Sequence, residues 1–287
     1  MLGPDDLVCS HFTLTGASPM EPARFGFAER VAAAGAAGFA GIGLLGFDYA
    51  LARAGGLSDA DIAAVLDDHG VVLAEVEFLM DWSAGPEETA RVRSARLLED
   101  RVWAMADALG PRVVSAGELV GPEQTPELST LVDRFGALCD RAAAHGLRVA
   151  LEFTPWSGIP DVATAATLVR EVDRANAGVN VDAWHWFRGR PDPSALRSIA
   201  DRVFVVQIDD ADDEVIGTLL EDTNERRRLP GEGVFDLVGF VTMLDGAGVR
   251  APLSVEVMSA TLRDLPVAEA ARRAHDATRG VVRRARP

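Results

Sequence analysis

Residues 148–186, RVALEFTPWSGIPDVATAATLVREVDRANAGVNVDAWHW, hold two short apolar runs with an amphipathic segment between them. The runs, at 148–153 and 177–182, are apolar almost throughout instead of alternating, which is typical of strands buried on both faces of a parallel sheet. The segment between them, 162–175, follows Asp161, a residue type that caps helix N-termini. We therefore expect two parallel strands joined by a helix.

The same alternation of apolar run and helical segment continues along the whole chain. It predicts an α/β fold, a single (β/α)8 TIM barrel over residues 1–287, with an open doubly wound sheet as the alternative. The sequence HFTLTGASP after the first run lacks the GxGxxG that such an open sheet would favour there. The expected strands are 7–14, 41–45, 71–78, 113–115, 148–153, 177–182, 203–208 and 253–257, and the expected helices are 22–36, 58–69, 88–109, 126–145, 162–175, 193–201, 235–247 and 266–284.

Charge and composition exclude several classes of function. The net charge of −16 argues against nucleic-acid binding, which requires clustered cations. The chain has no lysine, since all 28 basic residues are arginine, and this excludes Schiff-base aldolases, lysine-anchored pyridoxal phosphate enzymes and P-loop hydrolases. Cys9 and Cys139 lie far apart without a CxxC motif, so we expect two buried thiols and no structural zinc site.

Hydropathy predicts no membrane association. No apolar run approaches the roughly 20 residues that a membrane-spanning helix needs. The N-terminal sequence MLGPDDLV has no basic segment ahead of an apolar one, so we expect no signal peptide and a cytoplasmic location.

Four polar residues, Glu152, Asp182, Gln207 and Glu256, each lie at or near the end of an expected strand. In a barrel, functional side chains occupy the carboxyl ends of the strands, where these four would converge. One such carboxylate alone is more often a cap or a salt-bridge partner. Three carboxylates and an amide oxygen together suit a hard divalent cation, with Mn²⁺ or Mg²⁺ preferred.

The motifs LEFTPW, NVDAWHW, VQIDDAD and SVEV resemble the xylose isomerase-like barrel superfamily, in particular its sugar phosphate isomerase/epimerase group. That group also includes ketose 3-epimerases, inosose dehydratases and 3-dehydroshikimate dehydratases. The resemblance covers residues 148–260, and the barrel pattern extends it over the chain. It implies a metal site made by Glu152, Asp182, Gln207 and Glu256.

The sequence departs from the family pattern at Gln207, where a histidine often stands. A glutamine oxygen can still bind a cation, and it should shift the preference from zinc toward Mg²⁺ or Mn²⁺. The resemblance also implies that His185, in the D-x-x-H pattern, contacts substrate oxygens. The resemblance further implies that one arginine of RRRLPGEG reaches the substrate, with Arg228 as the first candidate and Arg227 as the alternative.

Other residues in the expected strand-end loops are weaker candidates for substrate binding. His11 either lines the pocket or packs in the core. Glu77 either faces the pocket or makes structural hydrogen bonds, and it shares a strand face with Glu75. Trp82 and Trp156 belong to a set of loop tryptophans that either seal the barrel mouth or form an apolar wall for a sugar-like substrate.

The residue types predict the chemistry. With a cation on the two oxygens of an α-hydroxyketone, Glu152 and Glu256 would act as general base and general acid around an enediolate. We expect a metal-dependent isomerase or epimerase of carbohydrate metabolism that acts on a small sugar-like molecule, with a metal-dependent dehydratase of the inosose or 3-dehydroshikimate type as the alternative. Barrels of this kind are frequently homo-oligomers.

Two further alternatives are a nuclease and a barrel that has lost catalysis. A related DNA repair endonuclease shares the barrel, but its trinuclear zinc site needs many histidines and this chain has five. Because of Gln207, a barrel that has lost catalysis remains an alternative: a degraded metal site would also show a substituted ligand position.

Overall fold

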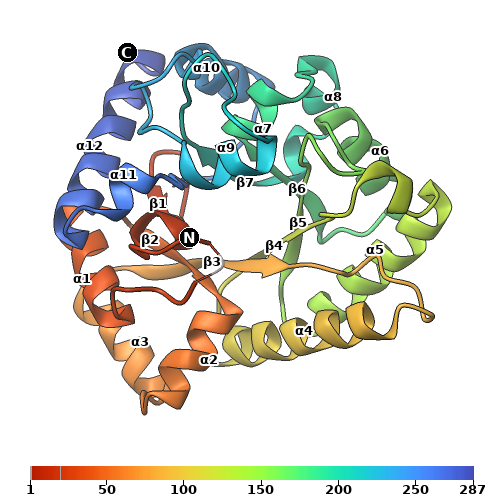
Figure 1. The fold of residues 1–287 in the computed structure, drawn as a ribbon, viewed down its shortest axis with the longest axis horizontal. Helices are drawn as coiled ribbons and strands as arrows, with labels where there is room; N and C mark the ends of the chain where they lie inside the picture. The colour runs from red at the N-terminus through yellow and green to blue at the C-terminus, as the bar shows by residue number, and fades with distance from the viewer. Residues whose placement is uncertain (1, 20) are drawn as a thin grey trace.

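Parallel strands pair in chain order, β1 to β8, and β8 pairs with β1 to close a barrel (Figure 1). The coordinates are a computed structural model that describes residues 2–19 and 21–287. This architecture confirms the predicted (β/α)8 barrel. The strands are β1 Leu7–Cys9, β2 Gly41–Leu45, β3 Val72–Leu79, β4 Val113–Gly117, β5 Arg148–Glu152, β6 Ala177–Asp182, β7 Val203–Ile208 and β8 Leu253–Val255.

The helices surround the barrel (Figure 1). The last helix, α12, lies beside α1 and closes the ring. The helices are α1 Phe27–Ala37, α2 Gly46–Ala54, α3 Asp59–Asp68, α4 Thr89–Leu109, α5 Leu128–Ala143, α6 Val162–Val172, α7 Ala183–Arg188, α8 Pro193–Arg197, α9 Leu219–Glu225, α10 Leu237–Ala247, α11 Ala260–Arg263 and α12 Val267–Ala285, and the 3₁₀ helices are η1 His11–Leu14, η2 Pro122–Gln124 and η3 Ala200–Arg202.

The first strand is shorter than predicted. It ends at Cys9, and the chain then turns into η1, where the sequence pattern predicted strand up to residue 14. The turn is held by polar bonds to the end of β8, since the Thr13 hydroxyl donates to the Val255 carbonyl at 2.7 Å and accepts from the Val257 N–H at 2.8 Å. These side-chain hydrogen bonds take the place of the backbone hydrogen bonds that a longer β1 would have made with its neighbouring strands.

Additional short helices follow several strands at their carboxyl ends. The helices α2, α7, α9 and α11 were not among the predicted ones. They lie between a strand and the next helix along the chain, which is where barrel enzymes place their functional loops. Cys9 and Cys139 are free and buried, as expected. No helix in the described part of the chain is long and apolar enough to cross a bilayer.

Candidate metal and active site

The carboxyl ends of β5 to β8 bring the four polar residues together. Glu152 ends β5, Asp182 ends β6, Gln207 lies in β7, and Glu256 directly follows β8. Asp182 pairs with Gln207 in the register of the β6–β7 ladder. All four side chains are buried, so their polar atoms need partners from the protein or from a ligand.

The closest group of possible metal donors consists of Glu152, Asp182 and His185. Each offers one atom, and these atoms lie within 4.8 Å of one another. His185 Nε2 lies 3.1 Å from Glu152 Oε1, and the His185 backbone N–H donates to Asp182 Oδ1 at 2.8 Å, which caps α7. Two carboxylates and an imidazole are a donor set that fits a divalent cation.

Gln207 and Glu256 are held in a hydrogen-bond network beside this group. Gln207 Nε2 donates to Glu256 Oε1 at 2.7 Å, and the Gln207 amide oxygen accepts from Asn180 Nδ2 at 2.6 Å. The amide oxygen that was predicted as a metal ligand thus faces Asn180 and not the carboxylates. The roles of Gln207 and Glu256 as ligands stay predictions, and Asn180 is a member of the site that the sequence pattern did not reveal.

The arginine at the centre of the site is Arg227, the alternative to Arg228 in the sequence motif, and a substrate contact of Arg228 stays a prediction. The Arg227 side chain is fully buried, and Nη1 donates to Asp182 Oδ2 at 2.7 Å and to Glu256 Oε2 at 3.1 Å. It also forms an ion pair with Asp209. The Arg228 side chain is 45% exposed and points away, toward Asp212, with Nη2 2.9 Å from Oδ2. Successive residues of an extended segment point to opposite sides, so only one of the two could reach the centre.

The charges of this network set the pKa values of its acids. Burial opposes ionisation of Asp182, but Arg227 and His185 outweigh it and lower the pKa of Asp182. Burial raises the pKa of Glu256 to about 8, against the opposing effect of Arg227. Burial also raises the pKa of Asp209 well above its usual range. The site therefore combines an ionised aspartate with a glutamate that can exchange a proton near neutral pH.

The weaker candidates occupy different environments. Trp82 packs in the hydrophobic core against Phe135, and its indole N–H donates to the Gly117 carbonyl at 3.0 Å, so it is not part of an open aromatic wall. Trp156 is half-buried and lies edge-on to His185, with ring centroids 5.3 Å apart. Of the tryptophans predicted in these loops, Trp156 is therefore the one placed to meet a substrate beside the donor group.

His11 and Glu77 are both buried and engaged by protein partners. His11 Nδ1 lies 3.3 Å from Arg30 Nη1, and burial together with this arginine lowers the pKa of His11 well below its usual value. Glu77 accepts from the His11 backbone N–H at 3.0 Å and lies near the Ser10 hydroxyl. The structure thus favours the alternative reading of Glu77, as a residue that makes structural hydrogen bonds.

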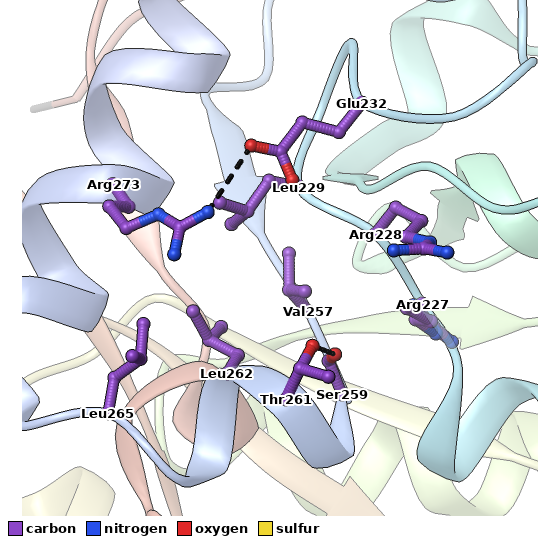
Figure 2. A pocket seen from close by; sticks show the side chains of 10 residues that line it. All are labelled: Arg227, Arg228, Leu229, Glu232, Val257, Ser259, Thr261, Leu262, Leu265 and Arg273. Atoms are coloured by element: carbon purple, nitrogen blue, oxygen red, sulfur yellow. Dashed lines mark hydrogen bonds and ion pairs between the residues drawn. The ribbon is translucent and has the colours of Figure 1, made fainter.

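A cavity of about 240 Å³ lies beside the end of β8 (Figure 2). Figure 2 shows Arg273 reaching Glu232 at one side, 3.5 Å apart, and the hydroxyls of Ser259 and Thr261 facing each other at another. Its wall shares Arg227 with the site but includes none of the candidate metal donors. The lining residues are Arg227, Arg228, Leu229, Glu232, Val257, Ser259, Thr261, Leu262, Leu265 and Arg273.

The architecture and the polar residues at its strand ends agree with a comparison to known families. Residues 31–280 match the model of the xylose isomerase-like TIM barrel. The chain belongs to this family. The family assignment confirms the resemblance found in the sequence motifs.

Curated relatives of this xylose isomerase-like chain include two kinds of enzyme. The 3-dehydroshikimate dehydratase of Pseudomonas aeruginosa is 31% identical over 242 residues, which are 83% of this chain and 37% of that protein. The inosose isomerase of Bacillus subtilis is 32% identical over 154 residues, which are 53% of this chain and 54% of that protein. The match thus spans little more than a third of the dehydratase and about half of the isomerase.

Solved structures share the fold at lower identity. A fusion protein of a xylose isomerase-like TIM barrel and a 4-hydroxyphenylpyruvate dioxygenase superposes with a TM-score of 0.84 at 23% identity, covering 99% of this chain and 43% of that one. The IOLI protein, solved with a bound zinc atom, gives a TM-score of 0.84 at 24% identity, covering 96% and 98% of the two chains. A D-allulose 3-epimerase from Methylomonas sp. gives 0.71 at 17% identity, covering 98% and 99%.

Proposed function

We propose that this chain is a divalent-metal-dependent enzyme that removes the proton next to the carbonyl group of a small cyclic or sugar-like hydroxyketone. The observation that carries the proposal is the convergence of Glu152, Asp182 and His185 donor atoms within 4.8 Å at the carboxyl ends of β5 and β6. Glu256, which directly follows β8, adds a second buried glutamate to the same site. These are the residue types that metal-assisted proton abstraction requires.

Glu152, Asp182 and His185 would hold the cation, and Gln207 and Glu256 remain further candidate ligands. A divalent cation bound here would act as a Lewis acid toward the carbonyl oxygen and the hydroxyl next to it. The imidazole in the donor group is compatible with zinc, whereas an amide oxygen from Gln207 would favour Mn²⁺ or Mg²⁺. We favour Mn²⁺ or Mg²⁺, and the bound zinc of the IOLI protein makes zinc the competitor to test.

Among the possible reactions we favour loss of water, in which one glutamate removes a proton and the other donates one. The Glu152 carboxylate takes the proton from the carbon next to the carbonyl group. The Glu256 carboxyl group gives a proton to the hydroxyl on the following carbon, which leaves as water while the carbon–carbon double bond forms. Arg227 holds Asp182 ionised throughout, because its guanidinium is the closest fixed positive charge to that carboxylate.

The preference for dehydration over isomerisation rests on the extent of the sequence match. The similarity to 3-dehydroshikimate dehydratases covers 83% of this chain, whereas that to inosose isomerases covers 53%. Isomerisation or epimerisation, which the sequence motifs placed first, is the second candidate, supported by the inosose isomerases. Both outcomes begin with the same proton abstraction.

One assay series distinguishes these outcomes. The purified protein is incubated in D₂O with Mn²⁺ and either 3-dehydroshikimate or a panel of inososes and ketoses. Conversion of 3-dehydroshikimate to an aromatic product, seen by its new absorbance, would support the dehydratase. Deuterium incorporation with rearranged inosose or ketose would support the isomerase. If no substrate reacts, and mass spectrometry finds no metal taken up on titration, the enzymatic proposal is wrong and the barrel is inactive.

A further inference from the structure

The interior of the barrel contains two carboxyl groups that the proposed chemistry does not use. Glu75 and Glu77 lie two residues apart on β3, and both are almost completely buried. The interior of a TIM barrel is normally filled by branched apolar side chains. Gly43 on β2 makes room for the pair, because a Cβ at that position would collide with Glu77 Oε1 and lie 3.1 Å from Glu75 Oε1. The absence of a side chain at Gly43 thus leaves room inside the barrel for both acid side chains.

Neither acid has a cationic partner within the described residues 2–19 and 21–287. Glu75 accepts from the Ser254 hydroxyl, and Glu77 accepts from the His11 backbone N–H at 3.0 Å. A buried carboxyl group without a compensating positive charge favours its neutral, protonated form. In agreement, burial and the neighbouring carboxylates raise the pKa of Glu77 well above its usual value.

Ser10 connects Glu77 to Glu256. The Ser10 hydroxyl oxygen lies 3.2 and 3.3 Å from the two carboxyl oxygens of Glu77 and 2.9 Å from Glu256 Oε1. A hydroxyl has one proton, so it can donate to only one of these acids at a time. Glu77 Oε1 already accepts from the His11 N–H, which leaves Oε2 to carry the proton of Glu77.

We propose that Glu77 is a positioning residue for Glu256 and acts through Ser10. Protonated Glu77 donates from Oε2 to the Ser10 oxygen, and Ser10 then directs its own proton to Glu256 Oε1. Together with Gln207, which donates to the same oxygen at 2.7 Å, this fixes the Glu256 carboxyl group in one orientation. The catalytic part of this inference rests on the proposed function, whereas the protonation of Glu77 and its bond to Ser10 do not.

The orientation matters because Glu256 has two oxygens with different partners. Oε1 accepts from Ser10 and Gln207, and Oε2 accepts from Arg227 at 3.1 Å. Without Ser10 as a donor, Oε1 would lose one of its two fixed bonds, and the carboxyl group could rotate away from the substrate. Small displacements of a catalytic group lower the rate of reaction much more than they lower substrate binding.

The test compares a substitution that keeps the donor with one that removes it. Glu77→Gln is neutral and retains an N–H₂ group that can donate to Ser10, whereas Glu77→Met is of similar length and has no donor. We expect Glu77→Met and Ser10→Ala to lower kcat roughly tenfold with little change in KM, and Glu77→Gln to retain most of kcat. The same two damaging variants should weaken Mn²⁺ binding about tenfold, as loss of outer-shell hydrogen bonds does in metal sites.

Glu75→Met is the matched control, because Glu75 lies on the same strand face with similar burial but contacts Ser254 instead of Ser10. It should leave kcat close to that of the wild type. Circular dichroism of each variant verifies that the barrel is folded.

Infrared spectroscopy supplies a measurement that does not depend on catalysis. The wild type minus Glu77→Gln difference spectrum should contain the C=O band of a protonated carboxyl group at neutral pH, and this band should shift in D₂O. If the band is absent, or if Glu77→Gln loses as much activity and Mn²⁺ affinity as Glu77→Met, Glu77 acts as a carboxylate and the inference is wrong. If the wild type turns over no substrate, the proposed function fails, while the infrared band still decides the protonation of Glu77.

Discussion

Arg227 donates from Nη1 to Asp182 Oδ2 at 2.7 Å, and neither side chain has any exposure to solvent. The same nitrogen lies 3.1 Å from Glu256 Oε2, and it also pairs with Asp209. One guanidinium thus contacts acids from three consecutive barrel strands or the segments that follow them. A buried cation of this kind stabilises the ionised Asp182, and its removal leaves that charge uncompensated.

We predict that Arg227→Met lowers the free energy of unfolding by about 3 to 5 kcal/mol, because it leaves Asp182 buried without its partner. The measurement is urea denaturation followed by circular dichroism. Arg228→Met is the control, since the exposed ion pair of Arg228 with Asp212 should contribute only about 0 to 1 kcal/mol. Similar losses in the two variants would contradict the placement of Arg227 at the centre of the site.

We predict that Glu152→Gln and Glu256→Gln each reduce kcat by about 10² to 10⁴, the range typical of losing a general acid or base. Both substitutions preserve side-chain length, so the barrel should remain folded. The Glu232→Gln variant serves as control, because Glu232 lines the neighbouring cavity and pairs with Arg273 outside the donor group. Wild-type turnover in either of the first two variants would rule out the acid–base assignment.

The strands and the strand-end acids were predictable because both leave local signals in the sequence. A buried parallel strand is an apolar run, and a polar residue at its end is visible without knowledge of the rest of the fold. The choice between Arg227 and Arg228 was not predictable in this way. It depends on which side of an extended segment faces the barrel, and this is set by the bridge between Arg228 and Asp210, residues far apart in sequence.

Other features depended on tertiary contacts for similar reasons. Trp82 follows an expected strand and so appeared to belong to the rim, but its packing on Phe135 of α5 places it in the core. The contact of Asn180 with Gln207 joins two strands and has no signature in either one. The end of β1 at Cys9 depends on hydrogen bonds to β8, at the other end of the chain.

We predict that Gln207→His shifts metal selectivity toward zinc. Replacing an amide by an imidazole adds a softer nitrogen donor beside Glu256, and nitrogen donors favour zinc over Mn²⁺ and Mg²⁺. The measurement is competitive loading of the metal-free protein with equal Zn²⁺ and Mn²⁺, followed by mass spectrometry. An Asn180→Ala variant changes the partner of the amide without adding a donor, and its metal preference should remain that of the wild type. An unchanged zinc-to-manganese ratio in Gln207→His would indicate that residue 207 is not a ligand.

We predict that Glu75→Gln makes the stability of the protein less dependent on pH. Burial raises the pKa of Glu75 to about 7, from its ordinary value of 4.5. An acid whose pKa is raised in the folded state holds its proton more tightly there than in the unfolded chain. Its full contribution to stability is therefore present below pH 4.5 and is lost as the pH rises toward 7. Because glutamine cannot ionise, the variant escapes this loss.

The difference between the free energy of unfolding of Glu75→Gln and that of the wild type should increase by about 3 kcal/mol from pH 4.5 to pH 8. If the new amide nitrogen has no hydrogen-bond partner, the free energy of unfolding of the variant is lowered by the same amount at every pH. The test therefore uses the slope, against pH, of the difference in free energy of unfolding between the variant and the wild type. The measurements are made with chelator present, since a cation held by Glu152 would change the charge that Glu75 experiences. Parallel curves for the two proteins would show that Glu75 ionises at the same pH in the barrel as in the unfolded chain, and that its burial does not control its protonation.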